Sequence, residues 1–147
     1  MTVKAQDIIT EALSWVGTPF AHQQAIKGVG ADCAGFIRAV SVATGATPDV
    51  EFETNYRRRE DGTQMLAELV KYMEPVESFE KARVGDVIAL HDGRDKSTTR
   101  HLAFVSQLSP YPKMVHASER GVVNHIINGH FKSLIHSVWR VPGLVYD

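Results

Sequence analysis

Apolar residues recur at helical spacing, every three or four positions, in three segments of the chain. The segments are residues 7–16, 33–40 and 65–73. Each is followed by a residue that commonly ends a helix, namely Gly17, Gly45 and Pro75. Residues 20–30 and 48–62 are rich in polar and turn-forming residues, so we expect loops there.

The second half of the chain changes to the short, alternating pattern of strands. Strands are expected at residues 86–90, 101–108, 113–117, 122–127 and 138–141. A polar loop at 91–100 and a proline-containing turn at 109–112 separate the first three of them. Helices followed by an antiparallel sheet predict an α+β fold. No repeat or linker interrupts the pattern, so we expect one domain over residues 1–147.

Composition excludes several function classes. Hydrophobic residues make up 44% and charged residues 22% of the 147, which is ordinary for a globular protein. A net charge of −1 gives no bias toward nucleic acid or membranes, so we expect no nucleic-acid partner. No apolar run reaches the roughly 20 residues that span a bilayer, so we expect no membrane insertion. The arginines at 57–59 precede two acidic residues; we interpret them as a solvated turn, with carboxylate binding as the alternative. The first residues carry no signal-peptide pattern, so synthesis in the cytoplasm is expected.

Cys33 is the only cysteine, so no internal disulfide forms within a chain. It stands at the expected start of the second helix. A thiolate is a strong nucleophile, and both a helix N-terminus and a nearby imidazolium would lower the pKa of this thiol from its usual value of about 8.5. The alternative is that Cys33 is a small buried apolar residue.

Two of the seven histidines, His101 and His116, lie in the expected strands at 101–108 and 113–117. If the chain turns at 109–112, His116 lies opposite His101 or one diagonal step away, about 5 to 8 Å between side-chain origins. His101 could then take a proton from Cys33 while His116 holds the correct tautomer of His101. We interpret the other strand and loop histidines as ordinary residues: His91, His125, His130 and His136. A zinc site from Cys33 and two histidines remains an alternative, but the spacing matches no usual zinc motif, so no metal is expected.

Five short motifs together resemble the NlpC/P60 family of papain-like cysteine peptidases. They are GTPF at 17–20, DCAGF at 32–36, VGDVI at 84–88, HLAFV at 101–105 and VHA at 115–117. The resemblance implies a cysteine-bearing helix packed on a central antiparallel sheet. It implies cleavage of amide bonds in the peptide stems of bacterial peptidoglycan, with Cys33 as nucleophile, His101 as base and His116 as the third polar member. No cofactor follows from it.

Phe20 departs from the family, which often has tyrosine there as an oxyanion donor. A missing donor can cost roughly 3 to 4 kcal/mol of transition-state stabilisation. The backbone N–H of Cys33 should remain, and we suggest that His22 or Gln23 supplies the second donor, with Asp32 as a supporting residue. The alternative is that His22 and Gln23 are ordinary loop residues.

Residues 17–35 look most like the subgroup encoded by tailed phages and gene-transfer particles. This resemblance implies incorporation into a particle tail, with tail-tip or baseplate proteins as partners and local opening of the cell wall during genome delivery. A structural tail-assembly protein on the same fold, with weak or no activity, is the alternative. A transferase acting on lipids or small amides is a third reading, but no apolar groove or membrane helix is indicated.

Overall fold

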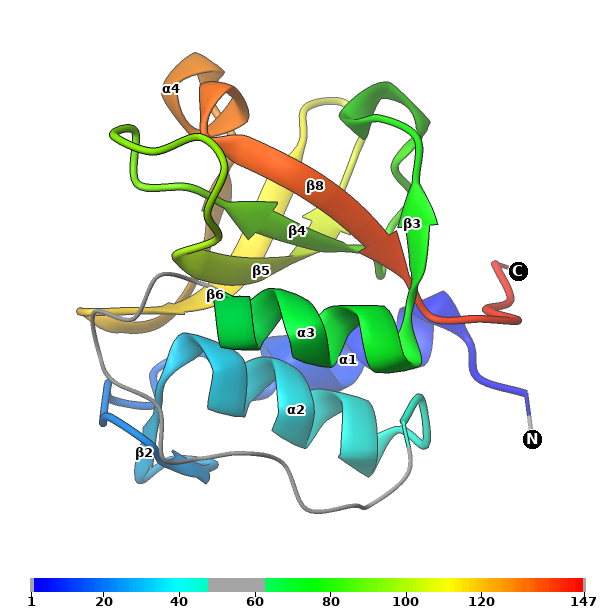
Figure 1. The fold of residues 1–147 in the computed structure, drawn as a ribbon. Coiled ribbons are helices and arrows are strands. Elements are labelled where there is room, and N and C mark those ends of the chain that lie inside the picture. The colour runs from blue at the N-terminus through cyan, green and yellow to red at the C-terminus, as the bar shows by residue number, and fades with distance from the viewer. Residues whose placement is uncertain (1, 48–62, 147) are drawn as a thin grey trace.

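The computed structural model describes residues 2–47 and 63–146. Three helices lie on one face of a six-stranded antiparallel sheet (Figure 1). The predicted α+β class is confirmed. The expected loop at 48–62 lies outside the described residues.

The three main helices occur where helical periodicity predicted them. They are α1 (Ala5–Leu13), α2 (Cys33–Ala43) and α3 (Thr63–Tyr72). α1 buries Ile8, Ile9 and Ala12, and it ends three residues before Val16 because the chain continues there in turns. Gly45 follows α2 with a φ of 79°, a conformation that glycine adopts without strain and that stops a helix.

The sheet has the strand order β3-β8-β4-β5-β6-β7. Its strands are β3 (Glu74–Val76), β4 (Val87–Leu90), β5 (His101–Gln107), β6 (Lys113–Ser118), β7 (Gly121–Ile126) and β8 (Ile135–Arg140). The last strand is longer than predicted and lies inside the sheet, between β3 and β4. β3 was not predicted; its Pro75 is tolerated because β3 is an edge strand.

The sequence pattern does not predict four further short elements. They are β1 (Ala25–Ile26), β2 (Gly30–Ala31), the 3₁₀ turn η1 (Phe79–Lys81) and α4 (Gly129–Ser133). β1 and β2 pair antiparallel inside the expected loop at 20–30. Elements of two to five residues are too short to carry a readable hydrophobic period.

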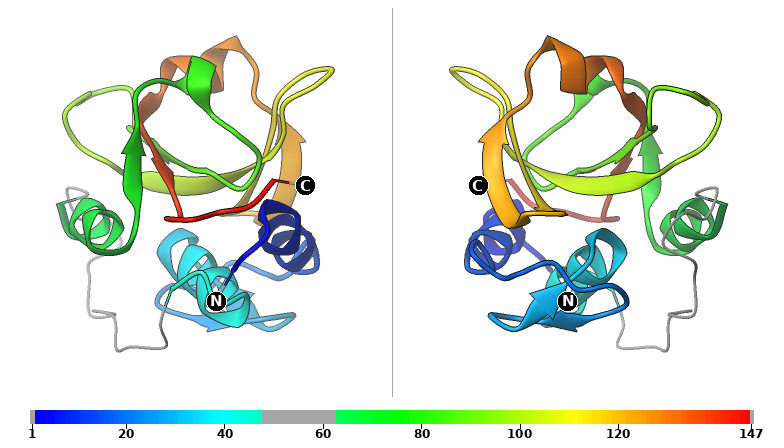
Figure 2. Two further views of the ribbon diagram at one scale, coloured as in Figure 1. Left: turned by 90° about the vertical axis from the view of Figure 1, so that its right-hand side faces the viewer. Right: turned by 90° about the vertical axis from the view of Figure 1, so that its left-hand side faces the viewer.

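The curved sheet buries apolar residues on both faces, with α1 and α2 lying beneath it (Figure 2). On the helical face, Phe36 of α2 makes edge-to-face contacts with Trp15 and with Phe104 of β5, each with ring centroids 5.8 Å apart. These buried rings fix α2 against β5, and they therefore fix the position of the first residue of α2, Cys33.

The end of β4 that lies farthest from His101 is fastened by a buried ion pair. Asp86 is 0% exposed. Arg140 of β8 donates from Nε and Nη2 to its two carboxylate oxygens, both at 2.9 Å. The backbone N–H of Arg83 donates to the same carboxylate at 2.8 Å. These three bonds satisfy a charge that would otherwise be costly to bury.

The two ends of the chain run side by side (Figure 1). The N–H of Ala5 donates to the carbonyl of Val145 at 2.8 Å, and the N–H of Val145 donates to the carbonyl of Val3 at 3.0 Å. Both ends lie at the right of Figure 1, whereas α2 begins at the left.

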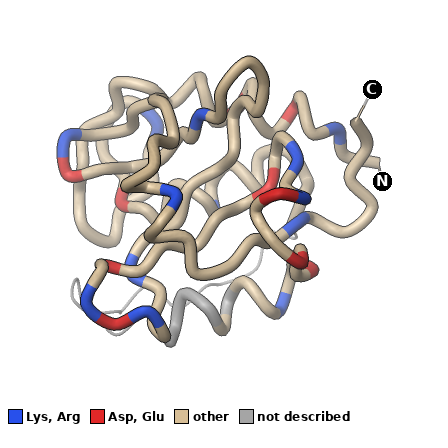
Figure 3. Tube along the Cα trace, turned by 90° about the horizontal axis from the view of Figure 1, so that it is seen from above, with Lys and Arg blue, Asp and Glu red and all other residues tan. Residues whose placement is uncertain are grey.

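Acidic and basic residues are mixed along the described chain rather than separated by sign (Figure 3). None of the helices in residues 2–47 and 63–146 has the length and hydropathy of a membrane-spanning segment.

Candidate active site

Asp32 ties the start of α2 to the loop before it. Its Oδ1 accepts from the backbone N–H of Gly35 at 2.8 Å, which makes Asp32 the N-cap of the helix. Its Oδ2 accepts from the backbone N–H of Gln23 at 2.7 Å, and Nδ1 of His22 lies 4.0 Å from the same oxygen. The three predicted supporting residues are thus brought together, with Asp32 buried and the other two exposed.

Gln23 stands out because its φ is 58°, a left-handed conformation that is uncommon for a residue other than glycine. Its N–H bond to Asp32 holds the backbone in this conformation. Since that N–H is already bonded, only the side chain of Gln23 could donate to a substrate.

Gly35 allows this loop to pass close to α2. A Cβ at Gly35 would lie 2.6 Å from the carbonyl oxygen of Gln24 and 2.8 Å from Oδ1 of Asp32. Both distances are too short for non-bonded atoms. Glycine at this position therefore allows the loop to pack closely against α2, two residues after Cys33.

Cys33 is free, 9% exposed and lies at the first position of α2. Burial, reinforced by the negative charge of Asp32, raises the pKa of its thiol to about 12. The backbone N–H groups of Leu102, Ala34 and Cys33 itself lower this pKa, but by less. The expectation of an acidic thiol is therefore wrong for this structure, because desolvation outweighs the helix end.

The hydrogen bond from the backbone of Leu102 also locates the sulfur of Cys33. The backbone of Leu102, which stabilises the thiolate form of Cys33, belongs to the residue directly after His101 on β5. α2 also packs on β5 and β6. The cysteine and the first histidine, 68 positions apart in the sequence, are thus neighbours across the contact between helix and sheet.

His101 and His116 are in direct contact. Nε2 of His101 lies 2.6 Å from Nδ1 of His116, and the rings meet edge to face with centroids 4.8 Å apart. Phe104 pairs with Val115, so continuing this register places His116 one diagonal step from His101, as predicted. The contact uses Nε2 of His101, and it leaves Nδ1 for other chemistry.

His125 was interpreted as an ordinary histidine, and the structure corrects this. Its Nε2 lies 2.7 Å from Nε2 of His116, with ring centroids 4.9 Å apart. The signal was present in the sequence: β6 and β7 pair with His116 opposite Val123, and period-two alternation then puts His125 on the same face as His116. His91 bonds the N–H of Gly93, His136 bonds the hydroxyl of Ser137, and His130 packs on Phe131.

The two inner histidines are held neutral. Burial lowers the pKa of His101 to about 4, with a further contribution from His125. Burial, followed by the charges of His101 and His125, lowers the pKa of His116 to about 3. At neutral pH the site therefore contains a thiol and neutral imidazoles rather than an ion pair.

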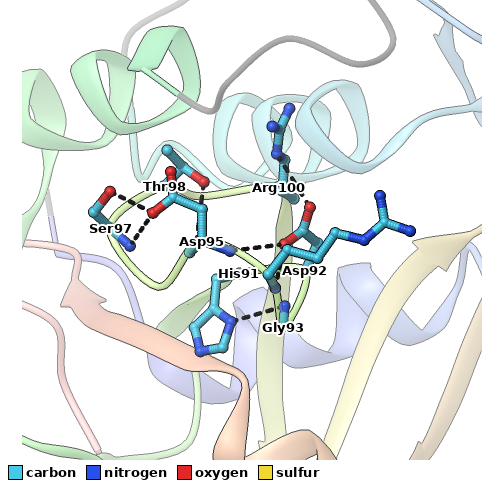
Figure 4. A network of polar contacts seen from close by, with 8 residues as sticks. His91, Asp92, Gly93, Asp95, Ser97, Thr98 and Arg100 are labelled. Carbon is cyan, nitrogen blue, oxygen red and sulfur yellow. Dashed lines mark hydrogen bonds and ion pairs between the residues drawn. The ribbon is translucent and has the colours of Figure 1, made fainter.

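The loop between β4 and β5 is organised by its own polar side chains (Figure 4). Nδ1 of His91 accepts from the N–H of Gly93 at 3.0 Å. Asp92 accepts from the N–H of Arg94 at 2.8 Å, and Asp95 accepts from the hydroxyl of Ser97 at 2.6 Å. These bonds give the loop a defined path into His101, and they assign His91 a structural role.

Within the described residues, no group of three or more His, Cys, Asp and Glu side chains is placed to hold a metal ion. A thiol beside neutral imidazoles can perform nucleophilic attack coupled to proton transfer.

Solved structures share this arrangement of helices and sheet. An NlpC/P60 family protein from Bacillus cereus matches 96% of the chain with a TM-score of 0.71 and 21% sequence identity. The NlpC/P60 domain of the peptidoglycan hydrolase SagA matches 92% with a TM-score of 0.63 and 19% identity. The chain has the NlpC/P60 fold. A further NLP/P60 protein, from Staphylococcus aureus and described as similar to lipoprotein, matches 93% with a TM-score of 0.65 and 21% identity.

The chain covers 97% of the SagA domain, but it spans only 41% of the Bacillus cereus and of the Staphylococcus aureus chains. No protein-family model and no curated protein matches the sequence. At these identities the likeness establishes the NlpC/P60 fold, so arguments about chemistry depend on the side chains of this chain.

Proposed function

We propose that this protein is a cysteine peptidase that hydrolyses amide bonds in the peptide stems of bacterial peptidoglycan. The observation that carries the proposal is that Cys33, at the start of α2, lies against the backbone of Leu102. Leu102 is the residue after His101 on β5, and His101 contacts His116 of β6. One of the solved NlpC/P60 neighbours is named as a peptidoglycan hydrolase, which supports this class of substrate.

The reaction begins with transfer of the Cys33 thiol proton to Nδ1 of His101 as the sulfur attacks the amide carbonyl. The tetrahedral intermediate then collapses, the carbon–nitrogen bond breaks, and His101 returns the proton to the leaving amine. Water, deprotonated by His101, next cleaves the thioester to release the carboxylate and restore the thiol. His116 orients His101 through the Nε2 contact during each proton transfer.

The neutral resting state shapes this mechanism. Burial raises the pKa of Cys33 to about 12 and lowers that of His101 to about 4. The thiol proton therefore moves to His101 during the attack, and Cys33 is not ionised before the substrate binds. The backbone N–H of Cys33, at the helix N-terminus, donates to the oxyanion. We propose the side chain of His22 or Gln23 as the second donor.

The test is digestion of purified muropeptides, followed by mass spectrometry of the products. Wild-type protein should release fragments cut within the peptide stem, and Cys33→Ala and His101→Ala should release none. The matched control is His136→Ala, which should keep full activity. His136 is a half-buried histidine of β8 that bonds Ser137. Cleavage that persists in folded Cys33→Ala would overturn the proposal.

The oxyanion donors are tested separately. His22→Ala and Gln23→Ala should each lower turnover on muropeptides if either side chain donates. Wild-type turnover in both folded variants would remove the oxyanion role from these residues.

We further propose that the protein acts as a component of a phage-type tail tip or baseplate, where it opens the cell wall during genome delivery. The support is the resemblance of residues 17–35 to that subgroup. Proteomics of purified particles from the source organism tests it, and absence from the particles would argue for another setting.

A structural tail protein with little activity is the second candidate. Phe20, which has no hydroxyl to donate where the family often has tyrosine, favours it. The muropeptide digest separates the two, because a purely structural protein would release no fragments. If Phe20 limits an active enzyme, Phe20→Tyr should raise its turnover.

A further inference from the structure

The three histidine rings form an unbroken series of hydrogen-bond contacts that ends at a backbone carbonyl. Nε2 of His101 faces Nδ1 of His116 at 2.6 Å, and Nε2 of His116 faces Nε2 of His125 at 2.7 Å. At the far end, Nδ1 of His125 lies 2.9 Å from the carbonyl oxygen of Ile126. A neutral imidazole has one N–H donor and one acceptor nitrogen, so each contact constrains the next.

The carbonyl of Ile126 fixes the direction of the whole series, because a carbonyl oxygen can only accept. When all three rings are neutral, Nδ1 of His125 carries the proton, and its Nε2 presents a lone pair. His116 then donates from Nε2 and accepts at Nδ1, so His101 must donate from Nε2. This leaves Nδ1 of His101 unprotonated.

We propose that His125 is a positioning residue that selects the reactive tautomer of His101, acting through His116 from the carbonyl of Ile126. The inference deepens the proposed function, on which it rests, because Nδ1 of His101 is the atom that takes the Cys33 proton in that mechanism. Without His125, neutral His116 can place its proton on either nitrogen. With its proton on Nδ1, His116 donates to Nε2 of His101. The proton of His101 then lies on its Nδ1, which can no longer accept the proton of Cys33.

The surroundings of His125 support this role. Its ring packs against Phe131 of α4 with centroids 5.0 Å apart, and α4 is capped by Asn128, which accepts from the N–H of Phe131 at 2.9 Å. On β7, His125 pairs with Met114 of β6. The ring is thus held between a strand partner and a capped helix, which keeps both of its nitrogens on their partners.

The tautomers can be read directly from imidazole ¹⁵N chemical shifts. In the wild-type protein at neutral pH, His101 and His116 should carry their protons on Nε2, and His125 should carry its proton on Nδ1. In His125→Leu, His101 should populate both tautomers. In His130→Leu, which removes a neighbouring exposed histidine of α4, the wild-type tautomers should remain. Nδ1 protonation of His101 in the wild type, or an unchanged single tautomer in His125→Leu, would overturn the inference.

Kinetics give the second readout. His125→Leu should lower kcat on muropeptides by about tenfold, comparable to the loss of one hydrogen bond, with KM unchanged because no substrate contact is lost. His125→Gln, whose amide oxygen can accept from Nε2 of His116, should recover most of the rate. A fall in rate that glutamine does not rescue would indicate a packing role only and would contradict the inference.

The two hypotheses fail differently. If the wild-type protein cleaves no muropeptide but shows the expected tautomers, the proposed function fails and the proton order stands. If it cleaves muropeptides through Cys33 but His125→Leu leaves both tautomer and kcat unchanged, the peptidase stands and the role of His125 fails.

Discussion

Replacing Asp32 should affect both folding and thiol acidity, because the same carboxylate caps α2 and lies beside Cys33. Asp32→Ala removes two bonds from a side chain that is only 6% exposed. Loss of a helix cap costs about 1 kcal/mol, and loss of the charged bond to the N–H of Gln23 costs about 1.5 to 3 kcal/mol. The free energy of unfolding should therefore fall by roughly 2.5 to 4 kcal/mol.

Asp32→Asn separates the two effects. Its amide oxygen can still cap α2 through Gly35, but its NH₂ group cannot accept from Gln23. The expected loss is therefore intermediate between zero and that of Asp32→Ala. Because the charge of Asp32 contributes to the raised pKa of Cys33, the thiol of folded Asp32→Asn should be more acidic than in the wild type.

Urea unfolding measures the stability, and the rate of iodoacetamide alkylation against pH measures the thiol pKa. Asp95→Asn is the matched control, since Asp95 also accepts from a backbone N–H and a second donor, but in an exposed loop. It should change neither quantity appreciably. The reasoning would be refuted if Asp32→Ala cost no more stability than Asp95→Asn, or if Asp32→Asn left the alkylation profile unchanged.

Three further outcomes are expected. Burial lowers the pKa of His101 to about 4 and that of His116 to about 3. Below about pH 6.5 the unfolded chain therefore binds protons that the folded chain does not. The free energy of unfolding should fall by about 1.4 kcal/mol per pH unit for each histidine, down to about pH 4.5. Arg140→Ala leaves the carboxylate of Asp86 buried without its main partner and should cost about 3 to 5 kcal/mol in urea unfolding. Gly35→Ala should destabilise the protein, although alanine normally favours a helix, because its Cβ would lie 2.6 Å from a backbone carbonyl.

Each of these has a control. A His101→Gln, His116→Gln double variant should show a shallower loss of stability on acidification than the wild type, and an identical slope would exclude these histidines as the cause. Lys81→Ala breaks an exposed pair with Glu77 and should cost less than about 1 kcal/mol. Gly129→Ala, at a helical glycine with open space around its Cβ position, should be neutral or stabilising in the same unfolding assay.

The start of α2 could be predicted because its signals are local. An aspartate N-cap, a helical apolar period and a following glycine all lie within 12 positions of Cys33 in the sequence. The contact between His101 and His116 was also predictable, since one turn and period-two alternation determine which side chains of a hairpin face each other.

What could not be predicted depends on the folded environment. The high pKa of Cys33 comes from burial beneath β5, which no spacing in the sequence reports. β8 was only partly predicted, because His136 and Ser137 interrupt its apolar pattern while the strand lies inside the sheet. The contact between His116 and His125, by contrast, follows from the same alternation rule as that between His101 and His116, because His116 lies opposite Val123.

The pairing of Ala5 with Val145 has a practical consequence for engineering. A fluorescent label or an affinity tag fused to either end would emerge from the same edge of the molecule, opposite the beginning of α2 (Figure 1). A short peptide joining the two ends could close the chain into a ring. New ends could then be opened in a surface loop, giving a permuted protein with its reactive groups undisturbed.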